Sequence, residues 1–99
     1  MSNVFIPGGD VLTLTIDSDG TSISLDGIGD VLRIVSTNAS LPSHWRAGIG
    51  TQTPADTDFA AFSGPAQFLF IGFDADSVGA KMPAGGHGGT VYVQRGSIR

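Results

Sequence analysis

The sequence predicts an all-β protein, either a β-sandwich or a barrel, built from about seven or eight short strands. Short stretches in which apolar and polar residues alternate recur along the 99 residues. Turns rich in glycine, aspartate and proline separate these stretches at close spacing. No stretch has the 3.6-residue period of an amphipathic helix.

An arm of residues 1–9 precedes a single domain, residues 10–99. The arm contains three consecutive apolar residues, Val4, Phe5 and Ile6, and a proline and two glycines follow them. A frayed terminus does not need such side chains. We therefore expect the arm to dock on its own domain or to add a strand to a neighbouring sheet, and its apolar residues are interface candidates.

Residues 11–17 and 21–25 alternate as two strands on either side of an Asp-Ser-Asp-Gly turn. This arrangement predicts a β-hairpin. One face of each strand is apolar, and we expect that face to line the core. The predicted core residues of this part of the chain are Leu12, Leu14, Ile16, Ile23 and Leu25.

Residues 30–36 hold the densest run of aliphatic and β-branched residues that keeps alternating polar members. Successive side chains of a strand point to opposite faces. Leu32 and Ile34 therefore share a face that we expect to line the core. Arg33 marks the opposite side, which faces solvent or a partner.

The next expected strand spans residues 44–50, with Trp45 and Ile49 on its inward face. Trp45 is the only tryptophan and is expected to close one end of the core. Residues 51–63 have no clear alternation and are expected to form a long connection that crosses between sheets.

Residues 67–73 are apolar on both faces of the expected strand, which normally means that both faces are covered. We assign Phe68 and Phe70 to the core. Leu69 and Ile71 then lie on the other face, which a loop or a second subunit would cover. That face is the second candidate interface.

Two final strands are expected at residues 77–82 and 90–94, with a glycine-rich loop at 83–89 between them and a short tail at 95–99. Tyr92 faces outward, where it is an interface candidate. The inward-facing core residues of these strands are Val78, Val91 and Val93.

The composition bears on partners and location. Nine acidic and five basic residues give a formal net charge of −4, which argues against nucleic acid as a partner. No apolar stretch has the roughly 20 residues of a membrane helix, no signal peptide is visible, and the absence of cysteine favours a reducing cytoplasm. Charged residues make up only 14% of the chain against a usual ~25%, which suits a protein packed against others or a sandwich with Ser and Thr on its outer faces.

No residue cluster spells out a catalytic, metal or cofactor site, so we expect a protein that is not an enzyme and has no cofactor. The Asp-Ser-Asp-Gly turn resembles the start of a calcium loop, but the chain contains no glutamate to complete it. Two of the loop aspartates Asp56, Asp58, Asp74 and Asp76 could act as the acid and base of a glycosidase. The two histidines, His44 and His87, could bind a metal ion, but no third ligand is obvious.

Taken in order, the strands resemble the capsid cement or decoration proteins of tailed bacteriophages, small virion proteins of the short β-sandwich type. The resemblance is carried by residues 12–16 (LTLTI), 22–25 (SISL), 30–35 (DVLRIV), 49–50 (IG), 55–58 (ADTD), 67–70 (QFLF) and 90–96 (TVYVQRG). The family pattern has a charged residue in the strand where this chain has its phenylalanines.

The resemblance implies a jelly-roll-like antiparallel β-sandwich on the outside of the phage head, made in the host cytoplasm. Such a protein clamps adjacent subunits of the major capsid protein and stabilises the capsid. It is non-enzymatic and often a homodimer or homotrimer.

The alternative is a carbohydrate- or receptor-binding module, because jelly rolls also serve as lectins. Tyr92 would then stack on a sugar, and Asp58 or Asp76 would accept its hydroxyl hydrogen bonds. A small glycosidase-like or metal enzyme is a third class that the residues barely support.

Overall fold

The computed structural model describes residues 4–37, 41–84 and 89–99. These ranges form nine strands and no helix. The strands are β1 (Phe5–Pro7), β2 (Leu12–Thr15), β3 (Thr21–Ser24), β4 (Val31–Thr37), β5 (Ser43–Gly48), β6 (Phe59–Ala61), β7 (Gln67–Phe70), β8 (Ser77–Lys81) and β9 (Thr90–Ile98). The count exceeds the expected seven or eight because β1 and β6 were not predicted as strands.

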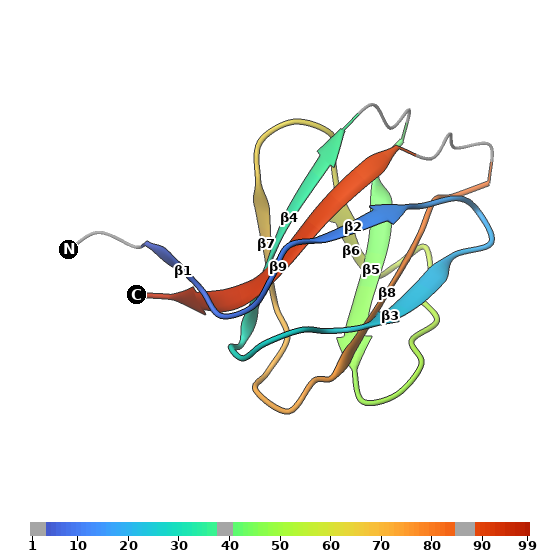
Figure 1. Cartoon of the computed structure of the whole chain (residues 1–99). Coiled ribbons are helices and arrows are strands. Elements are labelled where there is room, and N and C mark those ends of the chain that lie inside the picture. The colour runs from blue at the N-terminus through green and yellow to red at the C-terminus, as the bar shows by residue number, and fades with distance from the viewer. Residues whose placement is uncertain (1–3, 38–40, 85–88) are drawn as a thin grey trace.

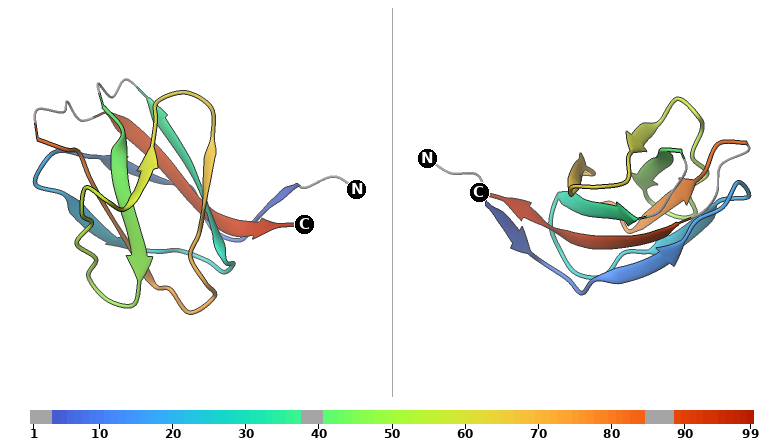
Figure 2. Two further views of the ribbon diagram at one scale, coloured as in Figure 1. Left: turned by 180° about the vertical axis from the view of Figure 1, so that it is seen from behind. Right: turned by 90° about the horizontal axis from the view of Figure 1, so that it is seen from above.

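The strands form two antiparallel sheets that lie face to face (Figure 1; Figure 2, right). Sheet A has the order β1-β9-β4-β7, and β2 also pairs with β9. Sheet B has the order β3-β8-β5-β6. The pairs β2–β9, β3–β8, β4–β7 and β5–β6 are nested within one another along the chain. This nesting is the strand order of a jelly roll, so the predicted fold class is confirmed.

The core lies between the two sheets and contains most of the residues predicted for it. The fully or almost fully buried members are Leu14, Ile16, Leu32, Ile34, Trp45, Val78, Val91 and Val93. Ile23 and Leu25 pack against this core while partly buried. Leu12 is partly buried and pairs with the inward Val93. The indole N–H of Trp45 is satisfied inside the core, because Nε1 donates to Ser43 Oγ at 2.8 Å.

Three core assignments were wrong: Ile49, Phe68 and Phe70. Ile49 is 70% exposed because β5 ends at Gly48 and the chain turns away from the sheet. In β7 the two faces are reversed relative to the expectation. Leu69 pairs with the buried Leu32, and Phe68 pairs with Arg33. Residues directly opposite each other share a face, so Leu69 points into the core and Phe68 and Phe70 point out.

The predicted hairpin does not form. Its turn is present, because Asp17 Oδ1 accepts a hydrogen bond from Asp19 N at 3.0 Å and Gly20 has a φ of 81°. The strands on either side nevertheless belong to different sheets: β2 pairs with β9, and β3 pairs with β8. The turn is therefore a corner at which the chain passes from sheet A to sheet B.

Residues 51–63 do not form one long crossing between the sheets. They contain β6, which pairs with its neighbour in sequence, β5, inside sheet B. The preceding loop folds back over the outer face of the same sheet. At Gly79 in β8, an added Cβ would lie 2.5 Å from the carbonyl oxygen of Gln52. Only glycine lets this loop approach so closely.

The C-terminal residues 95–99 are not a tail. β9 continues to Ile98 and pairs there with β1, so the predicted arm docks on its own domain. Backbone hydrogen bonds join Val4 and Arg99 in both directions, at 2.7 and 2.9 Å. The β1–β9 ribbon extends beyond the sandwich body, and Val4 and Arg99 pair at its tip (Figures 1 and 2).

The glycine-rich loop around His87 lies largely outside the described residues, so the expectation for it is not tested. Among the residues that are described, no helix has the length and apolar character needed to cross a membrane.

Candidate interaction surface

The two outer faces of the sandwich differ in how they are covered. Loop 49–58 lies over sheet B, where Gln52 N donates to Ser22 Oγ at 3.0 Å and Gln52 Nε2 donates to the carbonyl oxygen of Gly50 at 3.1 Å. On sheet A, Gln94 Nε2 donates to the carbonyl oxygen of Gly9 at 2.9 Å where β1 leads into β2, but among the described residues no loop is hydrogen-bonded to the outward side chains of β4 and β7. The outer face of sheet A is therefore the open broad face of the molecule.

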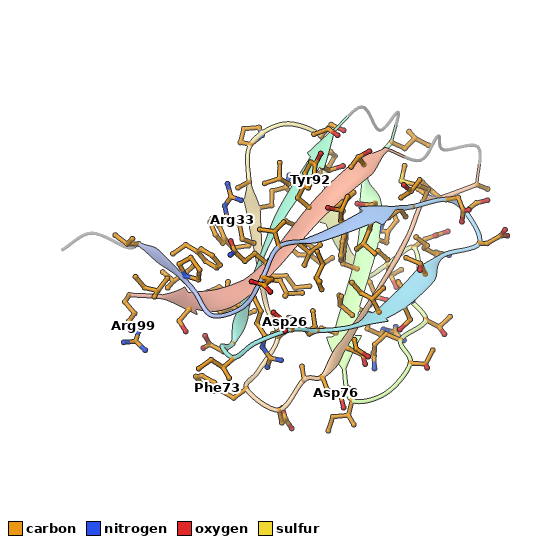
Figure 3. All side chains as sticks on the ribbon, in the orientation of Figure 1. Asp26, Arg33, Phe73, Asp76, Tyr92 and Arg99 are labelled. Atoms are coloured by element: carbon orange, nitrogen blue, oxygen red, sulfur yellow. The ribbon has the colours of Figure 1, made fainter. Side chains whose placement is uncertain are left out.

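The register identifies the side chains on this open face. Val31, Arg33 and Val35 of β4 pair with Phe70, Phe68 and Tyr92 of the adjacent strands. Phe70 is 70% exposed, Tyr92 is 40% exposed and Phe68 is 37% exposed. Figure 3 shows Arg33 and Tyr92 on this side of the molecule. The face thus combines large apolar side chains with a single arginine.

The arm completes the face. The Phe5 ring lies over Gly96 of β9, since an added Cβ at Gly96 would be 2.6 Å from Phe5 Cζ. Phe5 also contacts Phe68, with ring centroids 5.8 Å apart and an interplanar angle of 40°. Val31 pairs with Gly96 on one side and Phe70 on the other, and it is fully buried although it lies on the outer face. The register thus places Val31 between Phe70 and the glycine that Phe5 covers.

Two further large apolar side chains are exposed on the loops at the end of the sandwich that is nearer the ribbon. Ile28 is 78% exposed and Phe73 is 76% exposed. We call Phe5, Phe68, Phe70, Phe73 and Ile28 the phenylalanine surface. Exposed apolar side chains that lie together, as those of Phe5 and Phe68 do, often mark an interaction site.

Arg95 holds these end loops in place. It is 5% exposed, and its guanidinium group donates to four backbone carbonyl oxygens, those of Gly29, Gly72, Phe73 and Ala75. Gly29 precedes β4, and the other three lie between β7 and β8. A buried cation therefore ties together the two loops that carry Ile28 and Phe73.

The predicted interface residues have different outcomes. Leu69 and Ile71 pack against the core and are not on an exposed face, so their assignment was wrong. Val4, Ile6 and Tyr92 are 50%, 43% and 40% exposed, and Phe5 is partly buried on the outer face. These four are available for contact, and their role stays a prediction.

Two carboxylates fix the positions of loops through hydrogen bonds. Asp58 accepts from Ala55 N at 2.7 Å and pairs with Arg46 at 2.9 Å. The Ala55 hydrogen bond, aided by Arg46, lowers the pKa of Asp58. Asp76 accepts from Gly50 N at 2.9 Å and from the Ser77 hydroxyl, and these bonds lower its pKa, with a smaller contribution from the Arg95 charge. Both hold loops in place.

The structure does not bring together the residues proposed for sugar binding. Tyr92 lies on the outer face of sheet A, whereas Asp58 pairs with Arg46 of sheet B. Figure 3 shows Asp76 at the opposite end of the molecule from Tyr92. A surface hollow of ≈ 200 Å³ lies elsewhere, between residues 19–22, residues 51–54 and Lys81, and no aromatic ring lines it. Sugar sites commonly include such a ring for stacking.

The described residues contain no group of three or more histidine and acidic side chains placed to hold a metal ion. Of the two predicted histidines, His44 lies beside Asp58, with Nδ1 3.2 Å from its carbonyl oxygen, and His87 lies outside the described residues. Asp74 and Asp56 lie in different loops, and Asp56 pairs with Lys81 at 3.0 Å.

Comparison with protein-family models, with curated proteins and with solved structures finds no match to this chain.

The face reversal in β7 makes a direct prediction. Leu69→Ser is expected to lower the free energy of unfolding by about 1.5–3 kcal/mol, because it removes an apolar side chain from the core. Phe70→Ser is expected to leave stability nearly unchanged, because Phe70 is 70% exposed. Thermal melts followed by circular dichroism compare the two variants. A larger loss for Phe70→Ser would restore the original assignment of the faces.

The two carboxylate ties predict loss of stability in acid. A pKa that is lowered in the folded state stabilises the fold above the ordinary aspartate value of 3.8, and this stabilisation is lost as the pH falls. We expect the double variant Asp58→Asn, Asp76→Asn to show a shallower drop in melting temperature between about pH 4 and pH 2 than the wild type. Asp74→Asn is the matched control, because no hydrogen bond to its carboxylate occurs in the described part of the chain. If the melting temperature of the double variant fell as steeply in this pH range as that of the wild type, the prediction would be contradicted.

Proposed function

We propose that the chain is a structural virion protein, a decoration protein that binds the outside of a tailed-phage head and clamps adjacent major capsid subunits. The observation that carries this proposal is the phenylalanine surface on the open face of a jelly roll. Burying one such side chain contributes about 1.5–3 kcal/mol, so a few of them stabilise a contact appreciably.

The charged side chains described above support a role in binding and not in catalysis. Asp58 and Asp76 tie loops, Arg46 and Lys81 pair with aspartates, and Arg95 holds backbone carbonyls. These groups serve the fold and do not converge on a reactive centre. The unequal covering of the two sheets supports a one-sided protein, with one face toward its partner and the other toward solvent.

The proposed mechanism is mechanical. The open face and the ribbon would bridge neighbouring capsid subunits, and the contact area buried would oppose their separation. A standard interface of about 1,600 Å² can give anything from micromolar to picomolar affinity. Repeated over a shell, modest single contacts suffice, because subunits held together at many points separate only when many contacts break at once.

Imaging of particles tests this function. Virions purified from a culture that produces the chain are analysed for it by mass spectrometry and imaged by electron cryomicroscopy. We expect density for a protein of 10.1 kDa at regular positions on the outer surface of the head. Purified protein added to heads that lack it should restore this density and raise their resistance to heat. Absence of the chain from the particles, or its presence only in the tail, would contradict the proposal.

A second experiment locates the contact on the protein. The variants Phe70→Ser and Phe73→Ser are added to the same heads, and binding is measured by co-sedimentation. Ile49→Ser is the matched control, because Ile49 is 70% exposed and its loop belongs to the covered sheet B. Loss of binding with both phenylalanine variants and retention with the control is the expected result. Equal binding by all three would show that the contact lies elsewhere.

A further inference from the structure

The five basic residues of the chain differ in whether their charged groups have partners within the protein. Arg46 pairs with Asp58, Lys81 pairs with Asp56, and Arg95 is buried against carbonyl groups. Arg33 and Arg99 have no ion pair among the described residues. Arg99 lies at the exposed end of the ribbon, whereas Arg33 lies in the middle of sheet A.

Arg33 is partly buried, and its guanidinium group makes no hydrogen bond to any described residue. Phe68 and Gln94 lie directly across from it in the two adjacent strands, and Tyr92 lies diagonally. A guanidinium group carries five N–H donors, and those of Arg33 reach solvent, so they are hydrated in the free protein and available to a partner. The site therefore offers unused donors among aromatic side chains.

The carboxylates of the chain lie elsewhere. All nine aspartates are in the connections between strands, and none lies on a strand of sheet A. The side chains on the outer face of that sheet are neutral except for Arg33. The face thus carries one positive charge on a protein whose formal net charge is −4.

This charge pattern selects among possible occupants. A second copy that docked through the same face about a two-fold axis at its centre would bring the two Arg33 side chains toward each other, which is unfavourable. A nucleic acid would meet a single cation on an acidic protein. A partner surface with one carboxylate among apolar residues matches both the arginine and the phenylalanines, because Arg pairs with a carboxylate through two parallel hydrogen bonds.

We propose that the outer face of sheet A recognises an acidic side chain of a protein partner, with Arg33 as the pairing group and Phe68, Phe70 and Tyr92 as the apolar surround. The inference rests on the proposed function for the location of the contact and adds the chemistry of the partner. Arginine and tyrosine are also the residue types that most often dominate interface energies.

A random linear peptide library selected on the immobilised full chain tests the proposal without knowledge of the natural partner. The expected result is enrichment of peptides that carry Asp or Glu beside aromatic or aliphatic residues. Fluorescence anisotropy then gives the Kd of the enriched peptides for each variant. Arg33→Gln is expected to weaken binding at least about tenfold, and Arg33→Lys to weaken it less, since lysine keeps the charge and loses the paired geometry.

The controls separate a specific pair from general attraction. Arg99→Gln removes the same charge from the ribbon and should leave the peptide Kd unchanged. Selection on Arg33→Glu should enrich lysine or arginine in place of the acidic residue. All variants should melt as the wild type does, because Arg33 has no hydrogen bond to lose.

Several results would overturn the proposal. The selection would do so if the enriched peptides had no acidic preference or if none of them depended on Arg33 for binding. The Kd measurements would do so if Arg99→Gln weakened peptide binding as much as Arg33→Gln does. The proposal would also fail if the protein self-associated and dissociated on Arg33→Glu, or if this face bound single-stranded DNA in preference to peptides. The test is separable from that of the proposed function. Heads bound equally by wild type and Arg33→Gln would refute the acidic contact alone, whereas Arg33-dependent acidic peptides with no binding to heads would refute the virion role alone.

Discussion

Arg95→Met is expected to lower the free energy of unfolding by about 2–6 kcal/mol, because at least two buried carbonyl groups would lose their donor at about 1–3 kcal/mol each. Arg95 is 5% exposed and serves four carbonyls in two loops. For a domain of this size, each kcal/mol shifts the melting temperature by roughly 4–8 °C. Calorimetry should therefore show a drop of about 10 °C or more.

Two control variants test whether the loss of stability is specific to Arg95 and its guanidinium group. Arg99→Met removes an exposed arginine from the same strand region and should melt within a few degrees of the wild type. Arg95→Lys should fall between, because a single ammonium group cannot reach all four carbonyls with the geometry of a guanidinium group. If Arg95→Met instead melts like Arg99→Met, water satisfies the carbonyls and the loops do not depend on Arg95.

The second large effect is expected at the centre of sheet A. Leu32 is fully buried in the core, opposite Leu69 of β7. Leu32→Asp would place a carboxylate there without a partner, at a cost of several kcal/mol. That cost approaches the total stability of a small domain, about 5–15 kcal/mol. We expect an unfolded or aggregated protein, seen as loss of a cooperative transition in circular dichroism.

The matched control is Tyr92→Asp, which adds the same charge to the outer face of the adjacent β9. Tyr92 is 40% exposed, so the carboxylate stays hydrated and the variant should fold. A soluble Leu32→Asp protein that melts cooperatively would show that the faces of β4 are assigned wrongly.

Side-chain alternation was sufficient to predict which residues of most strands point inward. Val91, Val93, Leu32 and Ile34 are buried where the two-residue period placed them. The same period, continued, places Arg95 on the inward side of β9. The sequence predicted that this strand ends at residue 94, whereas β9 continues to Ile98, and a buried arginine is rare enough that alternation alone does not predict one. Its four carbonyl partners come from loops whose positions only the folded structure provides.

Alternation does not reveal which strand pairs with which. Residues 11–25 have the alternation and the turn of a hairpin, yet β2 pairs with β9 and β3 pairs with β8. A strand that is apolar on both faces is ambiguous in a further way. In β7 either face could have lined the core from the sequence alone, and the assignment of Phe68 and Phe70 was wrong because the register with β4 places Leu69 there. The phenylalanine surface was missed for this reason.

The nested pairing of the jelly roll also constrains the order in which the protein can fold. β9 is the partner of β1, β2 and β4, and it follows all three along the chain. Sheet A therefore cannot be completed until β9 has been synthesised. Contacts between residues far apart in sequence slow folding, and all-β proteins of this kind typically fold in milliseconds to seconds. Until β9 pairs with them, the strands of sheet A have exposed edges, so the chain is open to aggregation or to chaperones during that interval.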